Sequence, residues 1–380
     1  MFKQNDLTKG TTMKKLMVIA IALVSVNAFA TRARMNSLGN SYHIMDTQRI
    51  YMNPSDMFSF GDFVNLESGV TSDNSLTEGT NAEGMIVRTM GDSKLGLSIG
   101  HRSANAASFG LRATTLFGNY FAISNNNQQN PIEVSYGMKM GDAVYAGTLV
   151  YSNYNDKKNE QKESSLGVRF GGRMGAIDFS VAQGIDSKMT SGTAVNYKGK
   201  ANTGLFAGYT MDNNYFYGEI KLAGAEETVA GRELKSTSYK AGMTSSVKKD
   251  GSEFFYGVAL ASVETTFTTT ALGSRTNKSL NLPLTLGFEA DAASWLTVRG
   301  SITQTQFIAQ DKKEYSPASG ATINTESDPS ANNTVASIGA GLKFNKVTLD
   351  GSLSGLTGST AGQQLDGNTL LSQVGFTYMF

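Results

Sequence analysis

The sequence contains no cysteine, only five prolines and two histidines, and 33 basic residues against 32 acidic ones. Without cysteine, neither a disulfide nor a thiolate metal site can form. A net charge of +1 leaves no electrostatic footprint for nucleic acid, so we expect no such partner. No segment after the N-terminal region has the ~18 consecutive apolar residues of a transmembrane helix. A core, or a sheet that closes on itself, must therefore hold this chain together.

The N-terminal region has the pattern of a secretory signal. Lys14 and Lys15 precede an apolar run at 16–24, and the segment after it ends in Ala28, Phe29 and Ala30. A basic start, a short apolar core and an Ala-x-Ala end are typical of a cleaved signal peptide. We predict that residues 1–30 are a signal peptide with an N-terminal extension, cleaved after Ala30. A membrane anchor is the alternative, but the run is shorter than the ~20 residues that an anchor needs.

The last residues of the chain alternate between an apolar face and a small or polar face. Phe376, Tyr378 and Phe380 share the apolar face, whereas Gly375 and Thr377 lie on the other. This two-residue period predicts a β-strand. The three aromatic residues resemble the C-terminal recognition signal of bacterial outer-membrane β-barrels, which implies the barrel-assembly machinery as a partner. An ordinary half-buried last strand is the alternative.

Residues 63–380 repeat one unit, which is a strand, a tight turn, a second strand and a longer polar loop. The tight turns are rich in Gly, Asp and Asn, which favour turns, and lie at 91–93, 141–142, 172–175, 212–214, 249–251, 291–294 and 345–346. The longer loops lie at 71–83, 103–130, 154–163, 186–199, 225–235, 264–278, 306–333 and 356–368. This count predicts an all-β transmembrane antiparallel β-barrel of about 16 strands, with 14 as the alternative.

Nearly every predicted strand keeps one face free of charge. Ile132, Val134 and Tyr136 alternate with Glu133 and Ser135, for example. A Lys or Arg on a face in contact with lipid would cost ~2–4 kcal/mol at the middle of the bilayer. An open sheet edge would leave backbone groups unpaired in hydrocarbon, so the sheet must close. We therefore predict a barrel in the lipid of a Gram-negative outer membrane. Aromatic side chains are expected at its two interfaces, namely Trp295, Tyr215, Phe216, Phe254, Tyr256, Phe121, Tyr151 and Tyr154.

Residues 31–62 do not alternate and predict a periplasmic or lumenal lead-in. The segment contains Ser37-Leu38-Gly39, Asp46 and Asn53-Pro54-Ser55. It resembles the start of the long-chain fatty-acid transporter family, where this region folds as a plug before the first strand. It is also similar to the opening of the major outer-membrane porins of Bdellovibrio-type bacteria. The chain departs from the transporter family in its strand count and polar lumen, which puts a fatty-acid substrate in doubt. Alternatively, Asn53-Pro54 is only a turn before the first strand.

Charged residues on the inner face are the recurrent functional signal. A wall of mixed sign keeps water in a lumen of this width and selects polar solutes. The candidates for lining the pore are Glu133, Lys139, Arg169, Asp178, Glu219, Lys221, Lys240, Glu289, Arg299, Lys343 and Asp350, and the same register also directs Glu67, Arg88 and Arg102 inward. The long loops 103–130 and 306–333 are candidates for a constriction. Loop 103–130 contains enough apolar residues to pack into the pore mouth or onto a neighbouring subunit.

Catalysis is not supported by the sequence. Barrel hydrolases need a His paired with Ser or a carboxylate, and only His43 and His101 are present. We therefore predict that the protein is not an enzyme and has no metal or other cofactor. The predicted function is an outer-membrane porin that admits small hydrophilic solutes by passive diffusion. By analogy with sixteen-stranded porins, we expect a homotrimer. The alternatives are a plugged transporter for hydrophobic substrates such as fatty acids, or a structural or adhesive barrel with a closed lumen.

Overall fold

The computed structural model describes residues 31–69, 81–101, 131–158, 160–191, 195–227, 231–269, 273–316, 321–326, 333–357 and 371–380. None of the helices in these ranges is long and apolar enough to cross a membrane. The predicted signal peptide lies outside them. The strands of the described part are β1 (Phe63–Gly69), β2 (Asn81–Met90), β3 (Ser93–Ile99), β4 (Ile132–Met140), β5 (Ala143–Asp156), β6 (Gln161–Met174), β7 (Ile177–Ser191), β8 (Val195–Met211), β9 (Asn214–Glu227), β10 (Arg232–Lys249), β11 (Ser252–Thr269), β12 (Gly273–Ala293), β13 (Leu296–Ser316), β14 (Ala321–Glu326), β15 (Asn333–Phe344), β16 (Val347–Thr357) and β17 (Leu371–Met379).

The sheet closes into a barrel of sixteen antiparallel strands. Each strand from β1 to β13 pairs with its neighbour in sequence. Strand β13 then pairs with β15, so the wall continues from β13 to β15 without β14. The ring closes where β17 returns to β1, with Phe63 opposite Met379 and Gly69 opposite Gln373. Strand β14 pairs with the far end of β13 and stands outside the ring. The predicted count of sixteen is confirmed, and closure leaves no sheet edge within the membrane.

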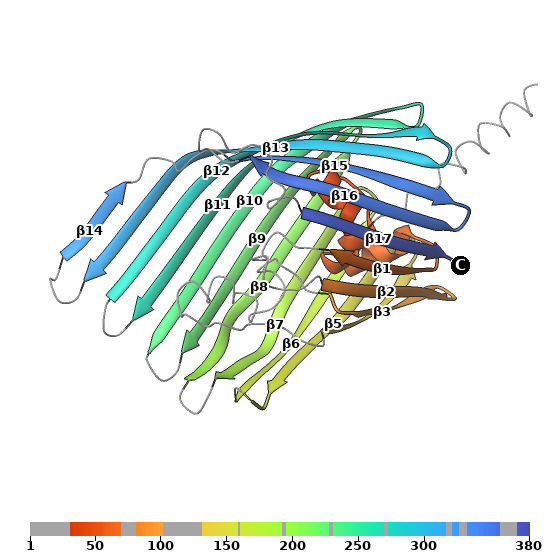
Figure 1. Ribbon diagram of the computed structural model, residues 1–380. Helices are drawn as coiled ribbons and strands as arrows, with labels where there is room; N and C mark the ends of the chain where they lie inside the picture. Colours follow the sequence, from red (N-terminus) through yellow and green to blue (C-terminus); the bar gives the residue numbers. More distant parts are fainter. Residues whose placement is uncertain are drawn as a thin grey trace, which may run out of the picture.

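The tight turns all lie at one end of the barrel, as predicted. They join β2 to β3, β4 to β5, β6 to β7, β8 to β9, β10 to β11, β12 to β13 and β15 to β16. Asp212, Asp250 and Asn345 adopt positive φ angles of 52°, 49° and 54° in these turns. Asp and Asn tolerate this left-handed conformation better than other residues with a side chain. The C-terminus lies at the same end (Figure 1).

At the opposite end, the predicted loops were too long. The loop expected at 264–278 is mostly strand, because β11 continues to Thr269 and β12 begins at Gly273. The same correction applies to 154–163, 186–199 and 225–235. These extensions carry polar residues on both faces, so they lack the alternation that identifies a strand, yet they pair through backbone and hydroxyl groups. Thr266 Oγ1 on β11, for example, is 3.0 Å from Thr276 Oγ1 on β12.

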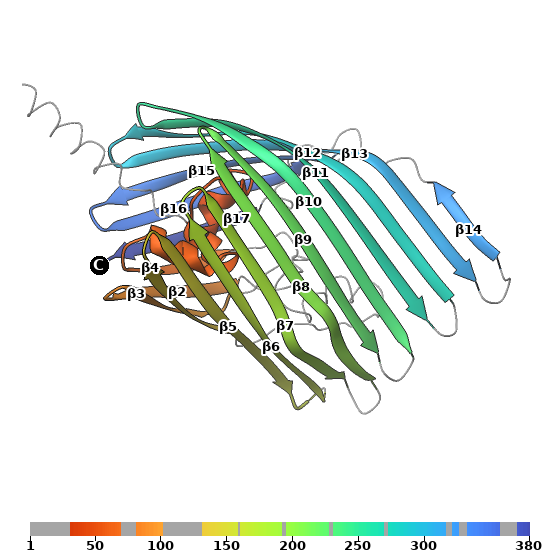
Figure 2. The same cartoon turned by 180° about the vertical axis from the view of Figure 1, so that it is seen from behind.

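The wall is therefore taller on one side. Strands β12 and β13 have 21 residues each, whereas about 9–11 residues span a bilayer. Figures 1 and 2 show β5–β14 extending well beyond the short strands β1–β4 and β15–β17. The prediction that residues 306–333 form a constriction loop was wrong in part. The first residues of this segment continue β13, and residues further along form β14, which pairs with the extended end of β13. The other constriction candidate, 103–130, lies outside the described residues.

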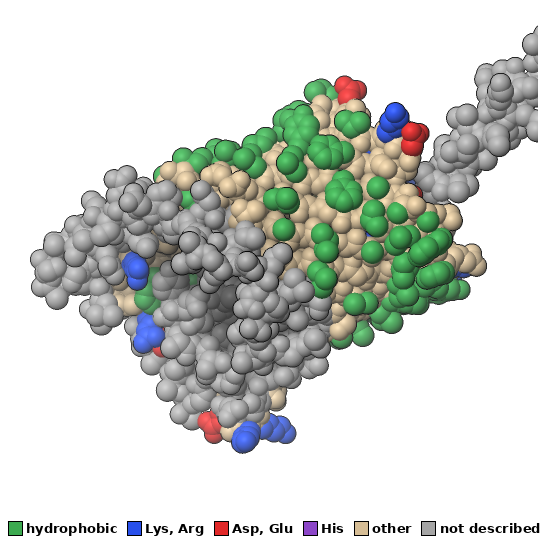
Figure 3. All heavy atoms as spheres, turned by 45° about the horizontal axis from the view of Figure 1, so that its top comes forward, with side chains coloured by type: hydrophobic (Ala, Val, Ile, Leu, Met, Phe, Trp, Pro, Cys, Tyr) green, Lys and Arg blue, Asp and Glu red, His purple; other side chains and the backbone are tan. Residues whose placement is uncertain are grey.

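The outer face of the wall is apolar over the height of a membrane. Leu286 and Ile338 expose 56% and 62% of their surface there. Figure 3 shows hydrophobic side chains spread over the described outer face, with charged side chains mainly near its ends. The aromatic residues Trp295, Phe216, Phe254, Tyr256 and Tyr151 are exposed on this face. Phe121 lies outside the described residues, and the side chain of Tyr154 is likewise not described.

Two predicted orientations were wrong. Arg88 points outward with 55% of its side chain exposed, lies 3.4 Å from Asp62 and sits over the ring of Phe380. The inner face of β2 instead carries Met85 and Val87. Arg88 directly follows Val87, so its side chain points to the opposite face of the strand. Tyr215 points inward and is 6% exposed, so it belongs to the lumen rather than to the interfacial ring of aromatic residues.

Residues 31–62 lie inside the barrel. They form the helix α2 (Arg32–Ser37) and two short 3₁₀ segments, η1 (Thr47–Tyr51) and η2 (Pro54–Ser59). We call residues 31–62 the plug. Figures 1 and 2 show it within the ring, near the end that carries the tight turns. Helix α2 packs against β13 and β15–β17, whereas η2 packs against β3–β6.

Candidate functional site

The candidate site is the lumen at the level of the plug. The side chains of the plug reach strands around the ring. Asn36 donates to Gln373 on β17 (2.6 Å), Tyr42 donates to Glu219 on β9 (2.6 Å), and the hydroxyls of Tyr51 and Ser98 on β3 are 2.7 Å apart. Contacts in several directions at one level mean that the plug spans the lumen.

Arg34 anchors helix α2 to β12. Its Nε and Nη2 donate to the two carboxylate oxygens of Glu289, at 2.7 and 2.8 Å. Glu289 also accepts from Arg299 Nε at 2.5 Å, and Arg299 Nη1 donates to Asp350 at 2.5 Å. Two parallel charge-assisted bonds fix both the position and the orientation of a guanidinium. Three predicted pore-lining residues, Glu289, Arg299 and Asp350, thus belong to a network that holds the plug.

Arg49 anchors the 3₁₀ segments to the opposite side of the wall. Its Nη2 donates to Asp178 on β7 at 2.7 Å, and its Nε donates to Asp56 of η2 at 2.9 Å. The Asp56 carboxylate also bonds to Arg173 on β6. The Tyr215 hydroxyl donates to Asp178 at 3.0 Å. Arg49 is 4% exposed and Asp56 is fully buried, so removing either partner would leave an uncompensated buried charge.

A third anchor joins the plug to the first two strands. Arg32 Nη2 donates to Glu83 on β2 at 2.6 Å, and the Arg32 backbone N–H donates to Glu67 on β1 at 2.7 Å. The side-chain amide of Gln48 donates to both carboxylates, at 2.8 and 2.9 Å. Two carboxylates on adjacent strands would repel each other, and these donors offset that repulsion.

Asn53 caps the 3₁₀ segment η2 and brings the plug close to the wall. Its side-chain oxygen accepts from the backbone N–H of Ser55 (3.2 Å) and from the Ser55 hydroxyl (2.8 Å), which caps η2 ahead of Pro54. A Cβ on Gly171 of β6 would stand 1.9 Å from the same oxygen. Glycine at 171 therefore lets the plug approach the wall closely, which a turn before the first strand would not require.

His101 lies at the contact between the plug and the wall. Its ring stacks on Tyr51 with centroids 3.4 Å apart and 8° between the planes. Its Nδ1 is 2.7 Å from Glu133 on β4, whose other oxygen accepts from Arg169 at 3.0 Å. The other histidine, His43 in the plug, lies 3.3 Å from Glu253. Both histidines therefore lie beside a wall carboxylate at plug contacts, and the absence of catalysis stays a prediction.

Asp46 is a second fully buried carboxyl of the plug, besides Asp56. One of its oxygens accepts from the Gln48 backbone N–H at 2.9 Å, and the other lies 3.6 Å from Arg34 Nη1. Burial raises the pKa of Asp46 to about 7, although Arg34 and the Gln48 N–H oppose this shift. The docked plug therefore holds a proton more tightly than an ordinary aspartate would.

The predicted pore-lining residues occupy inward positions of the wall, but in two settings. Lys343 is near the rim, where it donates to Asp291 at 2.9 Å, and Lys139 is exposed. The others lie deeper, and several contact the plug. The residues that sequence reasoning did not assign to the site are the plug side chains and their wall partners, namely Arg32, Arg34, Tyr42, Asp46, Arg49, Asp56, Glu83, Arg173, Tyr215 and Glu253.

A closed barrel with an apolar outer belt and a polar interior is the architecture that spans bacterial outer membranes. The protein is therefore a transmembrane β-barrel of the bacterial outer membrane, with its N-terminal segment inside the lumen.

Comparison with known proteins gives similar barrels but no family. No family model matches the chain, and no curated protein does. Among solved structures, the CymD monoaromatic hydrocarbon channel is 12% identical over 88% of this chain and 92% of its own, with a TM-score of 0.40. OmpT of Vibrio cholerae is 13% identical (83% and 96% covered, TM-score 0.37), and a Rh. blastica porin mutant is 11% identical (84% and 99%, TM-score 0.32). The narrower resemblances to Bdellovibrio-type porins and fatty-acid transporters stay predictions.

Proposed function

We propose that the protein is a gated outer-membrane channel, through which small hydrophilic solutes diffuse passively when the plug shifts. The observation that carries this proposal is the plug itself, which contacts β1, β2, β7, β9, β12 and β17 through polar side chains. A lumen crossed at this level does not offer the steady open pore of a simple porin. The plug continues directly into β1 at Phe63, so its N-terminal part can move furthest.

The inner wall beyond the plug supports a polar solute. Its inward positions carry hydroxyl and amide side chains, such as Ser236 and Thr265, whose oxygens are 3.3 Å apart, and Asn281. The charged residues that we predicted as pore-lining, among them Lys221, Lys240 and Glu219, add a field of mixed sign. Such a wall stabilises water and polar solutes rather than hydrocarbon chains.

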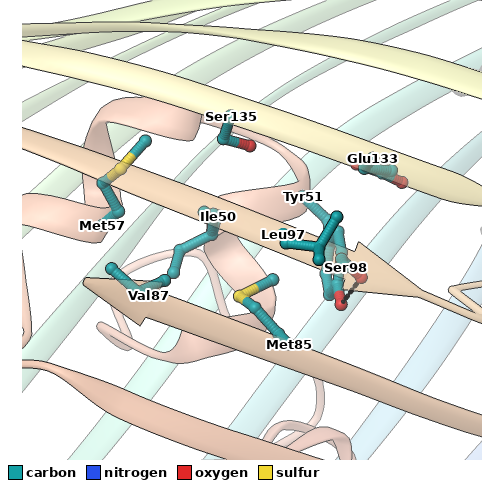
Figure 4. Close-up of a pocket in the computed structure, with 10 residues that line it drawn as sticks. Ile50, Tyr51, Met57, Met85, Val87, Leu97, Ser98, Glu133 and Ser135 are labelled. Atoms are coloured by element: carbon teal, nitrogen blue, oxygen red, sulfur yellow. Dashed lines mark hydrogen bonds between the residues drawn. The ribbon is translucent and has the colours of Figure 1, made fainter.

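Transport of a hydrophobic substrate is the second candidate, and one apolar region favours it. Ile50 and Met57 of the plug pack with Met85 and Val87 of β2, beside a cavity of about 10 Å³. Figure 4 shows these side chains converging between the plug and the strands, with Tyr51 bonded to Ser98. A cavity of this size holds about one water molecule. Hydrophobic transport would therefore need a much larger rearrangement of this contact.

The test is to lock the plug to the wall. The chain has no cysteine, so an engineered pair has no competitor. Ser37 Cβ lies 2.6 Å from where a Cβ on Gly339 of β15 would stand, about 1 Å closer than in a typical disulfide. A small shift of α2 therefore permits a bond in Ser37→Cys/Gly339→Cys. The control, Ser152→Cys/Ser165→Cys, joins residues directly opposite on β5 and β6, whose hydroxyls are 2.7 Å apart.

Single-channel recording in planar bilayers gives the readout. We expect the wild-type channel to open intermittently. The oxidised Ser37→Cys/Gly339→Cys variant, which we call the plug lock, should stay closed, and reduction of its disulfide should restore opening. The wall–wall control should behave as the wild type in both conditions. Steady conductance that the lock leaves unchanged would contradict gating by the plug. Absence of conductance in the wild type and in the reduced lock would contradict a channel altogether.

A further inference from the structure

Lys240 on β10 is a half-buried cation with no carboxylate partner among the residues that the structure describes. Among the described residues, no Asp or Glu oxygen lies within 4.0 Å of its Nζ, whereas Arg34, Arg49 and Arg299 each contact at least one. Lys240 Nζ instead lies 4.8 Å from the ring centroid of Tyr42, a plug residue, and 5.7 Å from that of Tyr217 on β9. An ammonium group in the lumen that lies over aromatic rings and has no carboxylate partner in the described part of the chain is open to an anion.

The nearest carboxylate is already occupied. Lys240 is directly opposite Glu219 in the pairing of β10 with β9. One oxygen of Glu219 pairs with Lys221, and the other accepts from the Tyr42 hydroxyl at 2.6 Å. Lys221 is the diagonal neighbour of Lys240, since it is opposite Ser238. Two ammonium groups and one carboxylate leave this part of the lumen with an excess of one positive charge.

The surroundings of Lys240 also provide several aromatic faces. The Tyr42 and Tyr217 rings have centroids 4.4 Å apart, and Tyr42 stacks on Phe206 of β8 at 5.5 Å with 24° between the planes. Aromatic faces bind flat apolar groups and other rings. We call Lys240, Lys221, Tyr42, Tyr217 and Phe206 the lumen anion site.

We propose that the lumen anion site binds a small organic anion that carries a carboxylate on a flat apolar body, such as an aromatic carboxylate. The carboxylate bonds to Lys240, with Lys221 nearby, and the ring lies against the tyrosines. The inference deepens the proposed channel function by naming a class of solute. Because Tyr42 belongs to the plug, a bound anion would draw Lys240 away from the Tyr42 ring and weaken one contact of the docked plug.

Binding can be measured without any conductance, so its failure is separate from failure of the channel proposal. The probe is benzoate, titrated against full-length mature protein in non-ionic detergent by ligand-observed NMR. Benzamide, which has the same ring without the charge, is the paired probe. The variants are Lys240→Met, Lys240→Arg and, as a matched control, Lys343→Met, which removes an inward lysine at the rim. Migration on unheated gels verifies that each variant is folded.

We expect benzoate to bind the wild type and the Lys240→Arg and Lys343→Met variants with similar affinity. Lys240→Met should lower the affinity for benzoate by at least about tenfold, since a charge-assisted hydrogen bond is lost. Benzamide should bind much more weakly than benzoate and should not respond to Lys240→Met. Equal affinity of benzoate for the wild type and Lys240→Met would overturn the proposal, as would equal losses in Lys240→Met and Lys343→Met. If Lys240→Met fails to fold, equal binding of benzoate and benzamide to the wild type would also overturn it.

Discussion

Arg34 of the plug binds Glu289 of the wall through two parallel hydrogen bonds of 2.7 and 2.8 Å. The two residues are 255 positions apart in the sequence, and their pairing ties helix α2 to the turn end of the long hairpin that β12 and β13 form. Three of the predicted pore-lining charges, Glu289, Arg299 and Asp350, are thereby part of a plug contact rather than free in open water. This relationship changes the expected behaviour of the lumen from an open pore to a closed one.

Arg34→Met should raise the open probability of the channel. The substitution removes a bidentate charged bond, and hydrogen bonds to charged groups contribute about 1.5–3 kcal/mol, so opening should become about tenfold more frequent or more. Single-channel recording measures this, with Lys343→Met as the control because Lys343 pairs with Asp291 at the rim. An open probability that stays at the wild-type level in folded Arg34→Met would show that the Glu289 pair does not hold the gate.

Arg49→Met should undock the 3₁₀ part of the plug while the barrel stays folded. Removing one partner of a buried ion pair costs about 3–5 kcal/mol, here by leaving Asp178 without its guanidinium. Hydrogen exchange should show faster exchange in peptides from 44–62 and unchanged exchange in β9–β13. The double variant Arg49→Met/Asp178→Leu should recover much of the protection, because it removes both charges. Equal exchange in the single variant and the wild type would refute this role of Arg49.

Docking of the plug should weaken as the pH rises. Burial raises the pKa of Asp46 to about 7 from an ordinary 3.8, so the docked state binds this proton more tightly than the undocked one. The stabilisation is complete below about pH 3.8 and is lost as the pH rises through about 7. The pKa of Asp56 is also raised by burial and acts in the same direction.

Exchange protection of the plug, corrected for intrinsic rates, should therefore fall by at least about tenfold between pH 4 and pH 8. Asp46→Asn isolates the contribution of this group, because an amide keeps the hydrogen bond from Gln48 but does not titrate. The variant should show a flatter profile than the wild type. A profile in Asp46→Asn as steep as that of the wild type would assign the pH dependence to other groups.

Leu284→Arg should destabilise the folded barrel by about 2–4 kcal/mol. Leu284 is 39% exposed on the outer face of β12, between the tight turn and the polar extension. Thr276→Arg is the control, because Thr276 lies on the same face of the same strand but eight positions away, beyond the apolar belt. Urea unfolding in liposomes measures both. Equal costs at the two positions would contradict the proposed limit of the membrane.

The sequence predicted the barrel because two-residue alternation and turn residues are local signals. Phe376, Tyr378 and Phe380 show their face within five residues, and Asp212-Asn213 marks its own turn. The strand extensions were missed since residues such as Thr266 and Thr276 are polar on both faces. The plug contacts were missed because they join distant residues. Three arginines in 32–49, ahead of strands with inward Glu and Asp, were the available signal, but the partner of each depends on how the barrel closes.

The most direct test of the central claim is which cysteine pairs form a disulfide in isolated outer membranes. The account predicts that Ser37→Cys/Gly339→Cys becomes oxidised, because α2 lies against β15. Ser37→Cys/Ser180→Cys should stay reduced, because Ser180 lies on β7 whereas α2 packs against β13 and β15–β17. Free thiols in both variants, or equal oxidation of both, would contradict a plug docked inside a membrane-spanning barrel.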